Sequence, residues 1–405
     1  MPLSMAAVAA GHTVFGVELN EARLKQLSRS ESYVEDITNA QIRAAFESGR
    51  YTVCDSAAAA GDFDVAVITV PTPERDGRPD LSHVIAATRS LGPLLRPGTT
   101  VVLESTTYPG TTEEVLAPLL RELSGLEPGV DFALGYSPER IDPGNPQWNL
   151  RSTPKIVSGI NDFSLRRVRA FYDSILDRSV PVGGTREAEL AKLLENTFRY
   201  VNIALVNELA MYAADEGIDI WETIEAAATK PFGFMRFLPG PGVGGHCIPV
   251  DPAYLSWRFN NRLGRPFQAF DFAHGVNRKM PEYVVERLRH GLSTRAKALR
   301  GSRVLVLGLA YKANIGDVRE TPARTICHAL RAAGADVRAT DPHVRDAPDD
   351  LFADVVALTA DEVRAADAVV LLTAHDDIDY DLVHEHASYV LDTRNRLVGP
   401  AVEKL

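Results

Sequence analysis

Short apolar runs alternate with amphipathic stretches over the first half of the chain. Uninterrupted apolar runs predict buried strands, whereas apolar residues spaced three or four apart predict helices. The predicted strands lie at 12–19, 63–73, 99–106, 130–140 and 154–160, and a helical stretch lies at 82–95. Strands separated by helical segments indicate a parallel, doubly wound sheet. Ligands bind at the carboxyl ends of the strands in such sheets, and the segments at those ends here are polar and rich in turn residues.

The pattern changes at residue 186. From there to Gly217 the sequence contains no Pro and no other Gly, as a long helix requires. We predict a helix of about 30 residues, against a mean of about 11–12, that spans between domains. A second helical stretch is predicted over 266–299, with a break or kink at Pro281. Strand and helix alternate again from residue 301. The predicted fold is therefore α/β, with two Rossmann-like doubly wound domains joined by a long central helix and a helical middle domain.

The first predicted unit opens with a helix instead of a strand. A dinucleotide-binding unit normally starts with a strand, a G-x-G-x-x-G turn and a helix, and its second strand ends in an acid for the ribose. Here the chain begins inside the helix, at "PLSMAAVAAG", and Glu18 ends the second strand. We expect that about 10–15 further residues would supply the first strand and the glycine turn. The alternative is a variant fold that starts with a helix.

Composition narrows the class of protein. A chain of 405 residues that is 45% hydrophobic can form two or three domains. A net charge of −11 argues against nucleic-acid binding and favours an enzyme of small molecules. Three cysteines without a C-x-x-C pair make a disulfide framework or a structural zinc site improbable, so we predict no metal. No apolar run approaches the roughly 20 residues of a membrane span, and no charged signal region opens the chain, so we expect a cytoplasmic protein.

One glycine-rich loop carries the most distinctive chemistry. Residues 239–252 read "PGPGVGGHCIPVDP", with the thiol of Cys247 four places before the carboxyl group of Asp251. Glycines at this density could cradle a phosphate or let the backbone approach another ligand closely. From the loop alone, Cys247 could be a nucleophile, a metal ligand or an incidental residue.

Six motifs together carry a resemblance to a known family. They are "TVPTP" (69–73), "ESTTYPG" (104–110), "SPERIDPGN" (137–145), "AKLLENTFRYVNIALVNE" (191–208), "PGVGGHCIPVDP" (241–252) and "GLAYKANIGDVRETP" (308–322). On these motifs the chain resembles the nucleotide-sugar 6-dehydrogenases, the UDP-glucose and UDP-N-acetylhexosamine dehydrogenase family, over essentially its whole length. Family members normally begin with a strand and "GxGYVGLP", and this sequence starts just inside that motif, at Pro2-Leu3.

The resemblance implies three domains and one reaction. The domains are an NAD-binding Rossmann domain at 1–183, a helical central and dimerisation domain with the cysteine loop at 184–299, and a UDP-sugar-binding domain at 300–405. Family enzymes oxidise C6 of the sugar from an alcohol to a carboxylate, and two NAD⁺ are reduced. The aldehyde formed first cannot donate a hydride until a nucleophile adds to it, and a thiolate is suited to that step. Cys247 is therefore the predicted nucleophile, whereas Cys54 and Cys327 are expected to be small core residues.

The resemblance also assigns roles to polar residues. Asp251 is implied to be a general base for water or for the alcohol proton. Lys192 and Asn196, spaced i, i+4 on one helix face, are implied to stabilise the oxyanion and to orient the substrate or its water. Glu139 is implied to assist thioester hydrolysis, and Thr106 to hold a water near the nicotinamide. The plainer alternatives are a helix cap for Asp251, a solvated lysine for Lys192 and a turn residue for Thr106.

The remaining implied site residues bind the two ligands. Those implied to contact NAD are Glu18, Val70, Pro71, Thr72 and Thr106. Those implied to contact the UDP-sugar are Glu139, Lys192, Asn196, Gly244, Lys312 and Arg319, with Arg394 as a further candidate. Cations suit the negative charges of UDP.

The substrate leaves alternatives open. The cysteine loop and "SPERIDPGN" are most similar to the branch that oxidises UDP-N-acetyl-D-glucosamine or UDP-N-acetyl-D-mannosamine. The UDP-glucose branch more often has a lysine where Val250 stands, so UDP-glucose is a second hypothesis. A simpler hydroxyacid-type alcohol dehydrogenase would lack the cysteine loop and the second nucleotide domain. A non-catalytic nucleotide-sugar binder is the hypothesis that applies if the first strand is truly missing.

The long helix also predicts an assembly. Its apolar positions, such as Val201, Leu205 and Leu209, exceed what one face of a linker needs, so we expect a homodimer or a higher homo-oligomer. The expected pathway role is the production of a uronic acid for a surface polysaccharide or a glycosylated metabolite.

Overall fold

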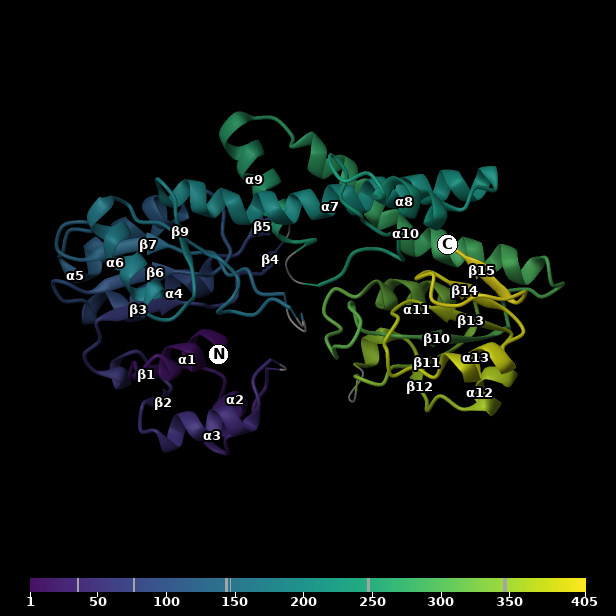
Figure 1. Cartoon of the computed structure of the whole chain (residues 1–405), viewed down its shortest axis with the longest axis horizontal. Coiled ribbons are helices and arrows are strands. Elements are labelled where there is room, and N and C mark those ends of the chain that lie inside the picture. Colours follow the sequence, from purple (N-terminus) through teal and green to yellow (C-terminus); the bar gives the residue numbers. More distant parts are fainter. Residues whose placement is uncertain (35, 76, 143–144, 146, 246–247, 345–347) are drawn as a thin grey trace. The chain divides into compact units, whose positions relative to one another are not determined.

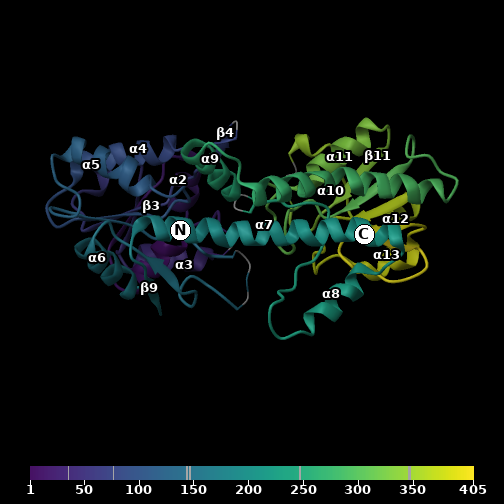
Figure 2. The same ribbon diagram turned by 90° about the horizontal axis from the view of Figure 1, so that it is seen from above.

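A computed structural model of the chain describes residues 1–405 except 35, 76, 143–144, 146, 246–247 and 345–347 (Figure 1). The chain forms two compact units. Unit 1 comprises Met1–Glu195 and Ala253–Leu263, and unit 2 comprises Asn196–Pro252 and Gly264–Leu405. Helix α7 (Thr185–Glu216) has 32 residues, begins in unit 1 and ends in unit 2 (Figure 2). This confirms the predicted long helix. No helix of the described residues is long and apolar enough to cross a membrane.

Unit 1 is a doubly wound α/β unit. Its strands are β1 (Val14–Val17), β2 (Tyr51–Cys54), β3 (Val65–Ile68), β4 (Glu74–Arg75), β5 (Arg78–Pro79), β6 (Thr100–Leu103), β7 (Ala133–Tyr136), β8 (Lys155–Val157) and β9 (Ser179–Pro181). Its helices are α1 (Pro2–Ala9), α2 (Glu21–Ser28), α3 (Asn39–Glu47), α4 (Ser82–Leu91), α5 (Ala117–Ser124), α6 (Asp162–Asp173) and most of α9 (Asp251–Leu263). Helices cover both faces of β6, because Val101 and Leu103 pack in the cluster that contains Leu120 of α5, and Val102 packs with Val168 of α6.

The parallel strands of unit 1 form three groups among the described residues. Strands β3, β6 and β7 form one parallel sheet, β1 pairs in parallel with β2, and β8 pairs in parallel with β9. Within the described residues no strand pairing joins β1 to β3. In a Rossmann unit the first strand lies between the second and the fourth. The described strands therefore fill the second to sixth positions and leave none for the first.

Strand β8 runs antiparallel to β7, which determines what lies at the carboxyl end of β7. The amide of Ser158 donates to the carbonyl of Tyr136 (3.1 Å), and that of Ile160 donates to the carbonyl of Leu134 (3.0 Å). As the donor moves along β8 the acceptor moves back along β7, so this pairing is antiparallel. The amino end of β8, at Lys155, consequently lies beside the carboxyl end of β7.

Unit 2 contains a complete Rossmann-like sheet. Its strands are β10 (Arg303–Leu307), β11 (Asp336–Thr340), β12 (Asp354–Val355), β13 (Ala368–Leu371), β14 (Val390–Asp392) and β15 (Val402–Lys404). Its helices besides part of α7 are α8 (Ile220–Ala228), α10 (Gln268–Ser293), α11 (Pro322–Ala332), α12 (Ala360–Ala365) and α13 (Tyr380–His386). All pairings are parallel, in the order β12-β11-β10-β13-β14-β15. This is the 3-2-1-4-5-6 order of a Rossmann fold, and it confirms the predicted fold class.

The alternation of side chains along β10 explains its continuous apolar sequence. Val304 and Val306 pack in the cluster that contains residues of α10 and α11, whereas Leu305 and Leu307 pack in the cluster with residues of α12 and α13. Both faces are buried, as in other parallel sheets. A break or kink was predicted at Pro281, and no break occurs there, because α10 is one helix through that residue. Pro281 lies on a buried face, and that burial offsets the roughly 3 kcal/mol that a proline costs inside a helix.

Candidate active site

The residues predicted to face NAD follow the carboxyl ends of β1, β3 and β6 in unit 1. Glu18 accepts hydrogen bonds from the amide of Asn20 (2.9 Å) and the hydroxyl of Tyr33 (3.3 Å), and its side chain is 20% exposed. An acid at this place fits the ribose hydroxyls of a dinucleotide. Val70, Pro71 and Thr72 follow β3, and the partly buried Thr106 follows β6.

Two unpredicted contacts hold these cofactor-side loops together. The hydroxyl of Ser105 donates to the carbonyl of Val70 (2.7 Å), which ties the loop after β6 to the loop after β3. The hydroxyl of Tyr254, on α9, donates to the carbonyl of Thr72. Ser105 directly precedes Thr106, so the position of that threonine depends on both loops.

Lys192 and Glu139 meet in unit 1. Lys192 is 8% exposed, and its Nζ donates to the backbone carbonyl of Glu139 (2.6 Å). Oε1 of Glu139 accepts the amides of Arg140 and Ile141, each at 2.6 Å. A lysine this deeply buried is not the solvated helix residue of the plainer alternative. Its catalytic role stays a prediction.

Asn196 and Asp251 meet in unit 2. The side-chain amide of Asn196 donates to Oδ2 of Asp251, which is 3% exposed and begins α9. Asp251 therefore combines a place at a helix N-terminus, which favours a carboxylate, with a polar partner on α7. The predicted nucleophile Cys247 and its neighbour His246 lie outside the described residues.

The glycine loop approaches the segment 308–322 closely. A Cβ on Gly244 would lie 2.7 Å from both the carbonyl oxygen of Glu320 and Cβ of Tyr311. Gly245, at φ +88°, donates its amide to the carbonyl of Arg319 (3.3 Å). Only glycine fits at both positions, because Gly244 lacks room for a Cβ and Gly245 has a left-handed backbone.

The candidate nucleotide-binding cations lie on two loops of unit 2. Lys312 is partly buried in the segment 308–322. The side chain of Arg319 is 60% exposed, and its Nε donates to Asp317 (2.8 Å). Nε of Arg394 donates to the carbonyl of Leu372 (2.6 Å), and burial lowers the pKa of Arg394 to about 10. Its Nη1 lies 2.6 Å from the Cβ position of Gly240, at the start of the cysteine loop.

Two asparagines that the sequence analysis did not single out fix the start of this loop. Oδ1 of Asn207, on α7, accepts the amide of Gly240 (2.9 Å), and its Nδ2 donates to Oδ1 of Asn277 on α10 (2.9 Å). Both asparagines are at least 96% buried. A polar residue on an otherwise apolar helix face is the signal that could have indicated them.

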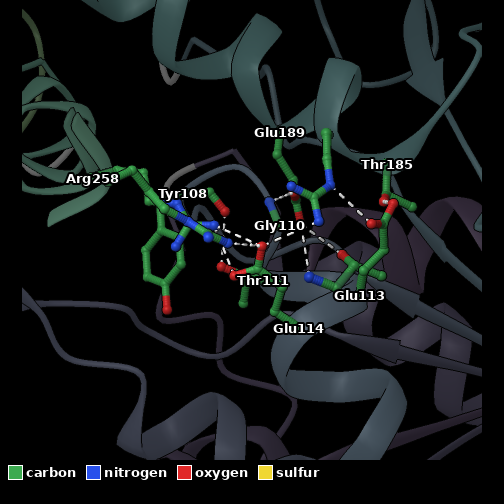
Figure 3. Close-up of polar contacts among 11 residues, drawn as sticks. Tyr108, Gly110, Thr111, Glu113, Glu114, Thr185, Glu189 and Arg258 are labelled. Carbon is green, nitrogen blue, oxygen red and sulfur yellow. Dashed lines mark hydrogen bonds and ion pairs between the residues drawn. The ribbon is translucent and has the colours of Figure 1, made fainter.

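Glu189 ties α7 to the loop that follows Thr106. Its carboxylate accepts the amide of Gly110 (2.5 Å), and the amide (2.9 Å) and hydroxyl (2.7 Å) of Thr112 (Figure 3). Burial raises the pKa of Glu189 to about 7, although these hydrogen bonds act in the opposite direction. Glu189 lies one turn before Lys192, so the same stretch of α7 carries the loop support and the predicted catalytic lysine.

Glu114 anchors α9 in the same region of unit 1. It forms ion pairs with Arg258 (2.7 Å) and Arg262 (2.6 Å) of α9 and with Arg186 of α7 (3.1 Å). The guanidinium of Arg258 also lies over the ring of Tyr108, as Figure 3 shows. The helix that begins at Asp251 is thereby held against the "ESTTYPG" loop.

Comparisons with known proteins agree with this architecture. Three models of the UDP-glucose/GDP-mannose dehydrogenase family match the chain, namely the NAD binding domain at residues 1–176, the central domain at 186–279 and the UDP binding domain at 305–398. The chain is thus by class an NAD-dependent dehydrogenase of nucleotide sugars. It belongs to the UDP-glucose/GDP-mannose dehydrogenase family, which confirms the resemblance and NAD as the cofactor.

Individual relatives match over nearly the whole chain. The UDP-N-acetyl-D-mannosamine dehydrogenase of Pyrococcus horikoshii is 31% identical over 99% of this chain and 94% of its own length. The UDP-N-acetyl-D-glucosamine 6-dehydrogenase of Pseudomonas aeruginosa is 35% identical over 90% of this chain and 86% of its own. A solved structure of a UDP-D-ManNAc dehydrogenase from P. horikoshii matches with a TM-score of 0.89, at 30% identity, over 100% of this chain and 96% of that one.

Proposed function

We propose that the protein oxidises a UDP-N-acetylhexosamine, UDP-GlcNAc or UDP-ManNAc, at C6 to the uronic acid, with two NAD⁺ consumed per sugar. The observation that carries the proposal is the pair of buried contacts made by α7. Lys192 contacts Glu139, and one helical turn later Asn196 contacts Asp251. The substrates named for the relatives from P. horikoshii and P. aeruginosa support the choice of sugar.

The proposed steps use this chain's residues as follows. Glu18 and the loop Val70–Thr72 would hold NAD⁺, and each of two NAD⁺ bound in turn would supply the acceptor for one hydride. In the first oxidation Asp251 takes the proton of the C6 hydroxyl, and Lys192 stabilises the oxygen that becomes negative. Cys247 then adds to the aldehyde carbon, and loss of the second hydride leaves a thioester.

Hydrolysis completes the proposed sequence. The oxygen of a water, held by Asn196, bonds to the thioester carbon while the carbon–sulfur bond breaks. Cys247 leaves as the thiolate, and Glu139 assists by accepting the proton of the water. The nucleotide is held by Lys312, Arg319 and Arg394, whose charges complement a diphosphate.

We further propose that the protein acts as a homodimer through α7. Its exposed apolar side chains recur on one stretch of the helix: Leu194 (62% exposed), Phe198 (45%), Leu205 (48%), Leu209 (44%) and Tyr212 (58%). Exposed apolar side chains that recur along a helix are typical of an interface. The proposed setting is the cytoplasm, and the uronic acid would enter a surface polysaccharide or a glycosylated metabolite.

A substrate panel tests the choice of sugar. The full chain is incubated with NAD⁺ and, separately, UDP-GlcNAc, UDP-ManNAc and UDP-glucose, and kcat/KM is measured from NADH absorbance. We expect the highest value for one of the N-acetylated sugars. A higher value for UDP-glucose would establish the second hypothesis instead. UDP-sugar binding in calorimetry without any NADH would show a binding protein and refute the enzymatic proposal.

A further inference from the structure

Lys155 is a buried cation that the steps above do not use. Its side chain is 4% exposed and forms an ion pair with Glu104, whose side chain is 2% exposed. Its Nζ also lies 3.5 Å from Oε2 of Glu139 and 5.4 Å from the ring centre of Tyr172. The hydroxyl of Tyr172 donates to Glu104 (3.1 Å). An unpaired buried charge is strongly destabilising, so these two carboxylates determine where the ammonium lies.

The topology of unit 1 explains why these groups meet. Glu104 directly follows β6, and Glu139 follows β7 by three residues. Because β8 is antiparallel to β7, its first residue, Lys155, lies at that same edge of the sheet. The hydroxyl of Ser137 donates to the carbonyl of Ile156 (2.7 Å), which fixes the two strand ends against each other.

Two carboxylates, those of Glu104 and Glu139, share the ammonium of Lys155. Burial raises the pKa of Glu104 despite its ion pair with Lys155. Glu139 is less buried, with 39% of its side chain exposed, and can therefore meet a substrate or a water.

Two lysines consequently hold Glu139 from different sides. Lys192 binds its backbone carbonyl, and Lys155 attracts its carboxylate. The first contact fixes the main chain, and the second acts on the direction of the side chain. In general, a cation beside a carboxyl group favours its ionised form.

We propose that Lys155 is a positioning residue for thioester hydrolysis, acting through the carboxylate of Glu139. The ammonium, 3.5 Å from Oε2 of Glu139, directs this carboxylate so that it can accept the proton of the attacking water. This inference rests on the proposed function, in which Glu139 assists the hydrolysis. It assigns Lys155 no contact with the sugar or with NAD.

Burst kinetics separate this step from the oxidations. The full chain is mixed rapidly with UDP-sugar and NAD⁺, and the NADH formed per active site is recorded over time. The mass of the enzyme in quenched samples is measured by mass spectrometry to detect a covalently bound sugar. In Lys155→Met we expect the burst of two NADH per site to remain, with steady-state turnover slowed about tenfold or more. The sugar thioester on the enzyme should accumulate, and KM for the UDP-sugar should fall together with kcat, so that kcat/KM stays unchanged. Lys155→Arg should restore most of the turnover.

Glu104→Gln is the matched variant, because it frees the same ammonium for Glu139. We expect the acid limb of the pH profile of kcat to move to lower pH in Glu104→Gln and to higher pH in Lys155→Met. A lysine that only supports the fold would lower the melting temperature in both variants without these opposite movements.

Three outcomes would overturn the inference. They are unchanged turnover in Lys155→Met, movement of the acid limb in the same direction in Lys155→Met and Glu104→Gln, and loss of the NADH burst together with turnover in Lys155→Met. If Lys155→Met does not fold, two other measurements test the inference: the acid limb of the pH profile of Glu104→Gln and the turnover of Lys155→Arg. A wild-type enzyme that gives no burst of two NADH would instead contradict the proposed function itself.

Discussion

Glu189 should make the folded protein less stable as the pH rises towards neutrality. The carboxyl group has an ordinary pKa of 4.5, which applies to the unfolded chain, whereas burial raises it to about 7 in the folded protein. Between these values the folded state binds more protons than the unfolded state, so the free energy of unfolding falls with rising pH. This contribution is fully present below about 4.5 and is lost once the pH exceeds about 7.

The size of the effect follows from the shift. One pKa unit corresponds to about 1.4 kcal/mol, so a rise from 4.5 to about 7 corresponds to about 3 kcal/mol. Glu189→Gln removes the titration and keeps the volume. Its amide group would face the amide of Gly110 or Thr112 and lose one hydrogen bond, at a cost of about 1–3 kcal/mol that does not depend on pH.

The assay is denaturant-induced unfolding of the full chain between about pH 5 and about pH 8. The stability of wild type relative to Glu189→Gln should decline by about 2.5 kcal/mol across this range, because part of the loss already occurs below pH 5. Glu187→Gln is the control, because Glu187 lies on the same helix and is exposed, and its curve should run parallel to wild type. A constant difference between wild type and Glu189→Gln over the whole range would refute the reasoning.

Three further variants test other parts of the structure. Asn207→Ala leaves the amide of Gly240 without its acceptor, so we expect a loss of about 1–3 kcal/mol in unfolding free energy and a raised KM for the UDP-sugar; unchanged values for both would contradict this role. Gly244→Ala places a Cβ 2.7 Å from the carbonyl oxygen of Glu320, so calorimetry should show UDP-sugar binding weakened at least about tenfold, whereas wild-type affinity would show that the loop does not need this close approach. Leu205→Arg charges the exposed apolar stripe of α7 and should give a monomer in light scattering at concentrations where wild type is dimeric; an unchanged mass would rule out this face as the interface.

The sequence predicted the fold best for strands that are buried on both faces, because such strands have a continuous apolar sequence. The run "RVLVL" of β10 is apolar at four of its five positions because each side of the strand packs under helices. The short strand β12 was not predicted, because its two residues, Asp354 and Val355, are exposed and do not form an apolar run. No break occurs at Pro281, because the packing of α10, a tertiary effect, outweighs the local preference of proline.

The candidate site was predictable in its residues but not in its partners. Spacing alone places Lys192 and Asn196 on one face of a helix, and the structure shows them there. Lys192 contacts Glu139, 53 positions away, and Asn196 contacts Asp251, 55 positions away. A periodic sequence pattern cannot predict contacts between residues so far apart in the chain. The same holds for Lys155, whose importance depends on the antiparallel course of β8.

The central claim is that one enzyme carries out both oxidations through Cys247, and the ratio of NADH formed to UDP-sugar consumed tests it most directly. The account predicts two NADH for each sugar in wild type, with the uronic acid as product. Cys247→Ala should form no uronic acid and should stop after the first oxidation. A ratio of one in wild type, or uronic acid from Cys247→Ala, would contradict the account.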